Sequence, residues 1–170
     1  MHKKLVSAAV AAGLAISVLP GTANSAEPSK SGTEKKAGSK EIERGRYMIV
    51  TGHCNNCHTA GYSASQGNVP EKDWLQGNSY GYRLGPGTSY SSNLRLTVQN
   101  YTETEWVKYA KTAKPRPPMP WWSLHETTEQ DLRAMYKFIR HLGPAGQPAK
   151  PFVPADQEPE KPYEVRQMVK

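Results

Sequence analysis

Apolar residues recur at the spacing of an amphipathic helix in three stretches of the chain, residues 41–52, 102–112 and 128–142. Side chains three, four or seven positions apart lie on the same face of a helix, so each stretch has one apolar face. The three faces consist of Ile42, Gly45 and Ile49; of Trp106, Tyr109, Ala110 and Ala113; and of Leu132, Met135, Tyr136 and Ile139. The pattern therefore predicts three helices.

Signals for helix ends support the second and third helices. Thr102 and Glu105 have the spacing of a capping box, in which the first and fourth residues satisfy each other's main-chain N–H groups. Thr128 is placed to cap the third helix, and Gly143-Pro144 is placed to stop it.

The stretches between and around the helices lack a sustained period. Residues 59–99 are rich in Gly, Ser, Asn and Tyr, and so long a loop in a compact domain is expected to wrap something. Residues 27–40 hold almost no apolar side chains and are predicted to form a disordered linker. Residues 144–170 contain six prolines and are predicted to form an extended tail, either packed on the surface or free. The predicted fold class is all-α with long loops.

Residues 1–26 have the form of a secretory signal peptide. Lys3 and Lys4 precede an apolar run over residues 5–19, and small residues follow it. The run is short for a membrane span, which needs about 20 apolar residues. We therefore expect residues 41–143 to form one helical domain in the periplasm, in contact with a membrane only if the signal peptide is retained.

Composition and charge narrow the picture further. The 170-residue chain has 14 glycines and 14 prolines, and 36% of its residues are hydrophobic. The predicted core is small, and small cores often depend on a staple such as a large apolar cofactor. The formal net charge of +7 becomes +5 when Lys3 and Lys4 leave with the signal peptide. This excess fits an acidic protein partner and is too weak and dispersed to indicate a nucleic acid.

The two cysteines of the chain stand in the sequence Cys54-Asn55-Asn56-Cys57-His58. This is the Cys-x-x-Cys-His pattern of c-type haem attachment. Two thiols three residues apart can reach the vinyl groups on one edge of a haem, and the next residue then lies under the iron. The pattern predicts one covalently attached haem c (heme c), with His58 as the first axial ligand.

Three other uses of the cysteine pair have weaker support. A redox-active disulfide usually accompanies a βαβ pattern, which is absent here. A zinc site needs a second pair of ligands at suitable spacing, and none follows. A small structural disulfide is compatible with an oxidising compartment and stays open.

The second axial ligand is predicted to be Met119. Prolines frame this residue within residues 116–122, and they hold the thioether with little backbone freedom to lose. The alternative role for Met119 is to fill a gap beside two tryptophans. His125 is its main rival as a ligand. Weaker candidates are Met48, Met135, His53 and His141.

Five segments resemble a known family: Gly45-Arg46-Tyr47, Cys54-Asn55-Asn56-Cys57-His58-Thr59, Ser92-Asn93-Leu94, Met119-Pro120-Trp121-Trp122 and Asp131-Leu132-Arg133-Ala134-Met135-Tyr136. On these segments, residues 41–143 resemble class I cytochromes c, in particular mono-haem relatives of the cytochrome c subunits of bacterial periplasmic dehydrogenases. Those subunits often carry three attachment motifs, whereas this chain has one.

The resemblance implies helices packed around one haem, with His58 and Met119 as axial ligands. It also implies that the first and last helices cross at Gly45 and Tyr136. A loop carbonyl is expected to accept a hydrogen bond from the second ring nitrogen of His58, and the carbonyl of Pro86 is our choice for it.

These features predict an electron carrier and not an enzyme. Histidine and methionine together occupy both axial positions of the iron and raise its potential, which suits one-electron transfer. The expected partners are redox proteins, either a dehydrogenase or a terminal oxidase. Lys108, Lys111, Lys114 and Arg116 run up to Met119 and are expected to steer an acidic partner. The alternative is a haem enzyme or a small-gas sensor with a displaceable sixth ligand.

Overall fold

The structure is a computed structural model, and it describes residues 30–167. The predicted signal peptide and the first residues of the predicted linker lie outside this range. The helices are α1 (Lys30–Thr51), α2 (Cys54–His58), α3 (Leu94–Thr97), α4 (Glu103–Thr112), α5 (Trp121–Glu126) and α6 (Glu129–Leu142), with 3-10 turns at Glu71–Asp73 and Val98–Asn100. The strands are β1 (Gly81–Leu84), β2 (Gly87–Tyr90), β3 (Val153–Pro154) and β4 (Tyr163–Val165).

The three predicted helices are present as α1, α4 and α6, and their end signals work as expected. The capping box of α4 is complete, because Thr102 and Glu105 each accept a hydrogen bond from the main-chain N–H of the other. Thr128 caps α6 by accepting from the Asp131 N–H at 3.1 Å. Gly143 follows its last turn with a φ of 71°, a conformation that favours glycine.

Helix α1 begins at Lys30, earlier than the sequence predicts, and residues 30–40 of the predicted linker lie within it. The correction has a physical reason. A helix extends easily from a turn that tertiary packing has already nucleated, and the Lys, Glu and Ala residues of this segment have good helix propensity. Within residues 30–167, no helix combines the length and the apolar character needed to cross a membrane.

The core lies where α1, α4 and α6 meet. Ile49, Leu132 and Ile139 are 0% exposed, and Trp106 of α4 is 4% exposed. Ile42, Tyr109 and Tyr136, also from the predicted apolar faces, pack against this core from partly buried positions. The faces read from the periodicity are therefore the faces that the fold buries.

Helices α1 and α6 cross at a different pair of residues from the predicted one. The atoms nearest to a Cβ placed at Gly45 belong to Ala134 and Phe138, which lie two residues before and two residues after Tyr136. The hydroxyl of Tyr136 instead donates to the Tyr101 carbonyl at 3.0 Å, beside α4. Gly45 thus packs against the main chain of α6, while Tyr136 contributes to the interface between α6 and the segment that precedes α4.

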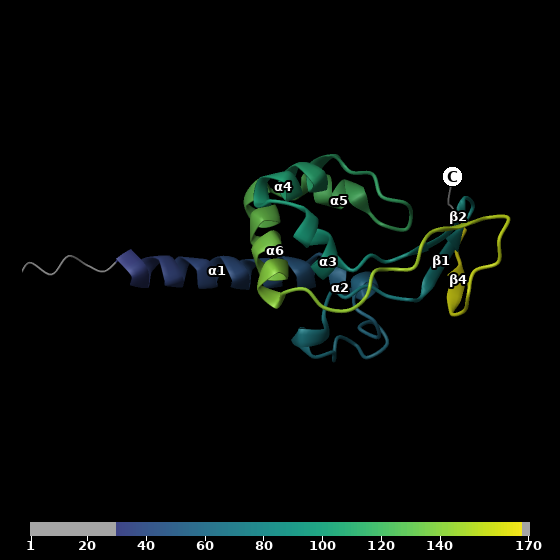
Figure 1. Ribbon diagram of the computed structural model, residues 1–170, viewed down its shortest axis with the longest axis horizontal. Helices are drawn as coiled ribbons and strands as arrows, with labels where there is room; N and C mark the ends of the chain where they lie inside the picture. The colour runs from purple at the N-terminus through teal and green to yellow at the C-terminus, as the bar shows by residue number, and fades with distance from the viewer. Residues whose placement is uncertain (1–29, 168–170) are drawn as a thin grey trace, which may run out of the picture.

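The fold also contains a sheet, so the all-α prediction is wrong in this respect. Strands β1 and β2 form an antiparallel hairpin inside the predicted long loop, and β3 and β4 of the tail flank it in the order β3-β2-β1-β4. Main-chain groups of a long loop need hydrogen-bond partners, and the loop and the tail supply them to each other. Figure 1 shows the sheet beyond the helices, with the yellow tail running to it from the end of α6.

Candidate functional site

The two cysteines lie on α2, directly after a sharp turn at the end of α1. His53 makes this turn with a φ of 58°, in the left-handed region. Within one helical turn, residues three apart lie on the same face, so Cys54 and Cys57 point in similar directions. Both thiols are half-buried and free. The structure therefore offers two unpaired thiols side by side.

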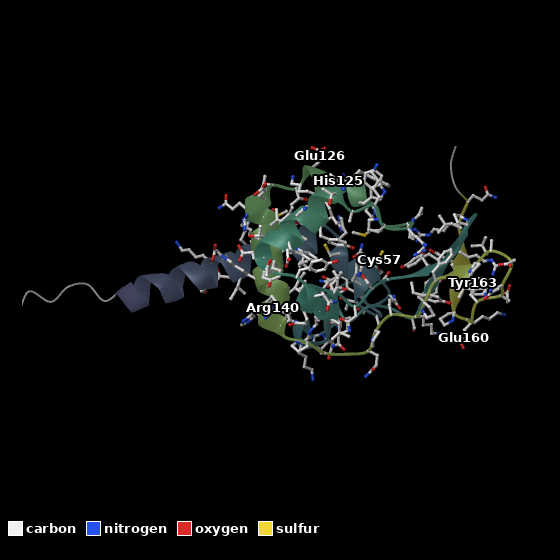
Figure 2. The ribbon with its side chains drawn as sticks, turned by 45° about the horizontal axis from the view of Figure 1, so that its top comes forward. Cys57, His125, Glu126, Arg140, Glu160 and Tyr163 are labelled. Carbon is white, nitrogen blue, oxygen red and sulfur yellow. The ribbon has the colours of Figure 1, made fainter. Side chains whose placement is uncertain are left out.

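Cys57 faces the sheet, and Figure 2 draws it between the helices and the strands. The phenol of Tyr82 on β1 lies beside the Cys57 thiol. The pKa of Tyr82 is raised, mainly by burial and next by this thiol. Burial also raises the pKa of Cys54 to about 11, which keeps its thiol protonated at neutral pH. Tyr82 lies within residues 59–99, where the sequence has no sustained period, so its position beside Cys57 was not predicted.

His58 is fixed in one orientation and one tautomer. Its Nδ1 lies 2.8 Å from the main-chain carbonyl oxygen of Ser92, and because a carbonyl only accepts, Nδ1 carries the proton. Burial lowers the pKa of His58, while the Ser92 carbonyl acts in the opposite direction with a smaller effect. The neutral ring therefore has an unprotonated Nε2, the form that binds a metal ion.

The carbonyl beside His58 belongs to Ser92, so the prediction that it belongs to Pro86 is wrong. Pro86 lies in the turn between β1 and β2. Ser92 directly precedes Asn93, the N-cap of α3, and the Asn93 side chain accepts from the Leu96 N–H at 3.1 Å. The Ser92-Asn93-Leu94 segment was visible in the sequence, but its spatial relation to His58 was not.

A buried hydrogen-bond chain holds α2 against the following loop. Thr59 donates from its hydroxyl to the Asn55 side-chain oxygen at 2.7 Å and accepts from the Leu75 N–H at 2.8 Å. The Gly77 N–H donates to the His58 carbonyl at 2.8 Å. Thr59 and Asn55 are each 1% exposed, so hydrogen bonds that are shielded from solvent fix the position of His58.

Met119 comes from a separate segment, the loop between α4 and α5. Its side chain is half-buried. Its N–H donates to the Arg116 carbonyl at 3.3 Å, and its carbonyl accepts from the Trp121 N–H at 2.9 Å. The prolines at positions 117, 118 and 120 restrict the backbone between these bonds. Met119 is therefore held in a stiff turn.

The rival ligands have other contacts. His125 donates from Nε2 to the Ala113 carbonyl at 3.0 Å, and its own carbonyl accepts from the Lys111 ammonium at 2.7 Å. These bonds close the base of the Met119 loop. Met135 is 5% exposed and packed in the helical core. His53 and His141 are exposed, and Met48 packs partly buried against the core.

The thiol, imidazole and thioether groups of the described residues are those that a covalently held haem requires. Two free thiols stand one turn apart, and the adjacent imidazole is locked in its metal-binding tautomer. The thiols could hold the group, His58 could bind its iron from one side, and Met119 supplies a thioether from another segment.

Comparison with known proteins agrees with this arrangement. A family model described as Cytochrome c matches residues 42–143. The chain is 29% identical over 138 residues to the cytochrome c subunits of quinone alcohol dehydrogenases from Gluconacetobacter polyoxogenes and Komagataeibacter europaeus, covering 80% of this chain and 28% of each subunit.

A third relative is the fructose dehydrogenase cytochrome subunit of Gluconobacter japonicus. It is 27% identical over 132 residues, covering 72% of this chain and 25% of that subunit. The chain thus spans about a quarter of the length of the curated relatives that it matches. No solved structure matches the chain.

Proposed function

Since this chain belongs to the cytochrome c family, we propose that it is a periplasmic mono-haem cytochrome that passes single electrons between redox proteins. The observation that carries the proposal is the orientation of His58. Its Nδ1 is committed to the Ser92 carbonyl, which leaves Nε2 unprotonated next to two free thiols. The chain has two cysteines and one attachment motif, which supports a single haem in this chain.

Each residue of the site has a separate task in this proposal. Cys54 and Cys57 hold the haem through thioether bonds, and His58 binds its iron through Nε2. The haem supplies reversible one-electron chemistry when bound. The hydrogen bond from Nδ1 to the Ser92 carbonyl keeps the ring in place and raises its basicity, as partners of metal-bound histidines usually do.

We propose Met119 as the second axial ligand. Two features favour it over His125: the prolines around it restrict its backbone, and His125 uses Nε2 to donate to the Ala113 carbonyl. A thioether opposite a histidine raises the reduction potential of the haem. Occupation of both axial positions also leaves no vacancy for oxygen or peroxide, which suits a carrier more than an enzyme.

The proposed partner is a dehydrogenase with an acidic docking surface. The relatives are cytochrome subunits of alcohol and fructose dehydrogenases, and this supports a dehydrogenase as electron donor. Of the four cations that precede Met119, Lys111 donates to the His125 carbonyl, and Arg116 lies on the Phe152 ring. Lys108 and Lys114 are exposed and stay available to a carboxylate.

An exposed tryptophan is the next residue in the chain after a ring that one of these lysines contacts. Trp122 is 58% exposed, and the Lys114 ammonium lies 5.4 Å from the centre of the neighbouring Trp121 ring. A flat apolar side chain with cations at its edge suits a transient interface, in which the apolar part gives contact and the charges steer the approach.

The experiment that tests the proposal is the visible spectrum of the mature protein, oxidised and reduced, with and without CO. A c-type spectrum that CO leaves unchanged supports a closed, six-coordinate carrier. A c-type spectrum that shifts promptly with CO means an open or labile site and favours the gas-sensor or haem-enzyme alternative. A protein without any haem spectrum, made in a host that attaches c-type haem, would contradict the proposal.

A further inference from the structure

The tail after α6 is tied to the domain by buried side chains. Arg95, which is 5% exposed, donates to the Gly143 carbonyl at 2.6 Å. Asn93, which is 3% exposed, donates to the carbonyls of Ala145 and Gln147 at 2.7 and 3.1 Å. The first part of the tail is therefore fixed beside α3 before it reaches the sheet.

The next part of the tail packs tightly on the β1–β2 hairpin. Val153 pairs with Thr88 of β2. A Cβ at Gly87 would stand 2.3 Å from the Val153 carbonyl oxygen and 2.6 Å from Cζ of the Phe152 ring. Gly87 has a φ of 144°, so both its conformation and its surroundings require glycine. The Phe152 ring is thus held against the hairpin.

The Phe152 ring also meets the Met119 loop. The Arg116 guanidinium lies 4.2 Å from the centre of the ring, within the range of a cation–π interaction. A cavity of about 80 Å³ beside this contact is lined by Phe152, by Leu84 and Ser89 of the hairpin, and by Pro117 of the loop. Phe152 therefore joins three segments that are far apart in the sequence.

Arg116 is coupled to Met119 through the backbone of the loop. The Arg116 carbonyl accepts a hydrogen bond from the Met119 N–H at 3.3 Å. Two prolines fill the positions between them, and their fixed φ angles leave few ways to absorb a movement of Arg116. His125 closes the base of the loop through the Ala113 carbonyl, while Phe152 contacts its tip.

We propose that the tail is a clasp for the axial-ligand loop, in which Phe152 is a positioning residue that acts through Arg116 to hold Met119 in place. The proposal rests on Met119 being the second axial ligand. Loss of the clasp leaves the base of the loop closed but frees its tip. The Met119 sulfur then leaves the iron more often, and the transient vacancy admits an external ligand.

The test is CO binding to the reduced, haem-loaded full chain of the Phe152→Ala variant, followed by stopped-flow absorbance. We expect the rate of CO binding to rise about two- to fivefold, the population change that loss of one exposed cation–π contact produces. A second readout is the pH at which the oxidised protein loses the charge-transfer absorption of its methionine–iron bond. This pH should fall, because hydroxide or a lysine replaces a loosely held sulfur more easily.

Matched variants separate positioning from general destabilisation. Arg116→Lys keeps a cation that can reach the ring and should preserve both readouts. Val165→Ala removes apolar surface from an exposed residue of the same tail, 73% exposed, and should change neither readout. Arg116→Gln removes the cation and should reproduce Phe152→Ala. It also provides the test if Phe152→Ala does not fold. The double variant should add nothing to either single one.

Met119→Ala sets the reference for an open site. If it binds CO rapidly while Phe152→Ala and Arg116→Gln behave like the unchanged protein, the clasp is wrong and the proposed function stands. If Met119→Ala binds CO no faster than the unchanged protein, Met119 is not the ligand and the clasp falls with that assignment.

Discussion

Gly45 of α1 lies against the main chain of Ala134 in α6, so close that a Cβ at Gly45 would stand 2.0 Å from the Ala134 carbonyl oxygen. The same Cβ would stand 2.7 Å from Cβ of Phe138. Backbone atoms cannot move aside as the end of a flexible side chain can. The absence of a side chain at this one position therefore sets how closely the two helices approach, and their approach encloses Ile49 and Ile139.

Gly45→Ala should lower the free energy of unfolding by about 1–3 kcal/mol, the usual cost of forcing an extra group into a packed interface. Denaturant unfolding followed by circular dichroism measures it. Gly38→Ala is the control, since nothing lies within 4 Å of a Cβ at Gly38 in the same helix. That change should be neutral or stabilising by up to about 1 kcal/mol, because alanine favours a helix more than glycine does. Equal effects of the two substitutions would contradict the close crossing.

Replacement of both thiols, in Cys54→Ser with Cys57→Ser, should abolish covalent attachment of haem. The intact protein should keep its haem through denaturation and acidic organic extraction, whereas the variant should release all of it. Mass spectrometry of the extracted polypeptide measures this. Tyr82→Phe removes the hydroxyl next to Cys57 but leaves both thiols, and it should retain the added mass. A double serine variant that keeps the added mass would rule out thioether attachment at these positions.

Met119→Ala should open the sixth coordination position while the haem stays attached. The potential should fall, because the thioether that favours the reduced iron is gone. Potentiometric titration and CO difference spectra measure the two effects. Met135→Leu is the matched control, because it removes another candidate methionine from the helical core and leaves the Met119 loop intact. Its potential and CO response should stay close to those of the unchanged protein. A CO response from Met135→Leu, with none from Met119→Ala, would exchange the roles of these two methionines.

Lys114→Glu should slow electron transfer from an acidic dehydrogenase partner by roughly threefold at low ionic strength, since a charge at the rim of an interface acts mainly on the association rate. The difference from the unchanged protein should shrink as salt is added, because exposed charges are screened. Stopped-flow reduction of the haem measures the rate. Lys161→Glu makes the same change of charge on the exposed tail and should have little effect. A rate that is independent of salt in all three proteins would rule out electrostatic docking.

The ion pair between Arg44 and Asp131 should make stability depend on pH at the start of α6. Arg44 binds both carboxylate oxygens of Asp131, at 2.7 and 3.2 Å, and its side chain is the main reason why the pKa of Asp131 lies below its usual value. A lowered carboxyl pKa in the folded state means that the stabilisation is complete above the unfolded-state pKa, about 3.9. It is lost as the pH falls through the folded-state value.

Asp131→Asn should therefore unfold more easily than the unchanged protein at neutral pH, and the difference should diminish as the solution is acidified. Urea unfolding at a series of pH values measures it. Asp156→Asn alters an exposed aspartate of the tail that has no ion pair among the described residues, and it should follow the unchanged protein. A difference for Asp131→Asn that is constant with pH would show that the effect is not ionic.

The features that were predicted correctly from the sequence are local ones. The apolar faces of α1, α4 and α6 were visible because helix periodicity is a property of neighbouring residues. The capping box at Thr102 and Glu105 was visible for the same reason, because both of its partners lie within one turn. The thiol and imidazole spacing over residues 54–58 was equally local, since five consecutive residues on α2 supply it.

Contacts between segments that are far apart in the sequence could not be predicted from local patterns. The partner of His58 is the carbonyl of Ser92, 34 residues away, and any loop carbonyl has the same chemistry. The sheet forms because the tail pairs with the hairpin, and short strands in Gly- and Pro-rich segments carry little periodicity of their own. The contact between Arg116 and Phe152 likewise has no local signature. The order of the amino acids specifies which chemical groups are available, and the path of the folded chain specifies which of them meet.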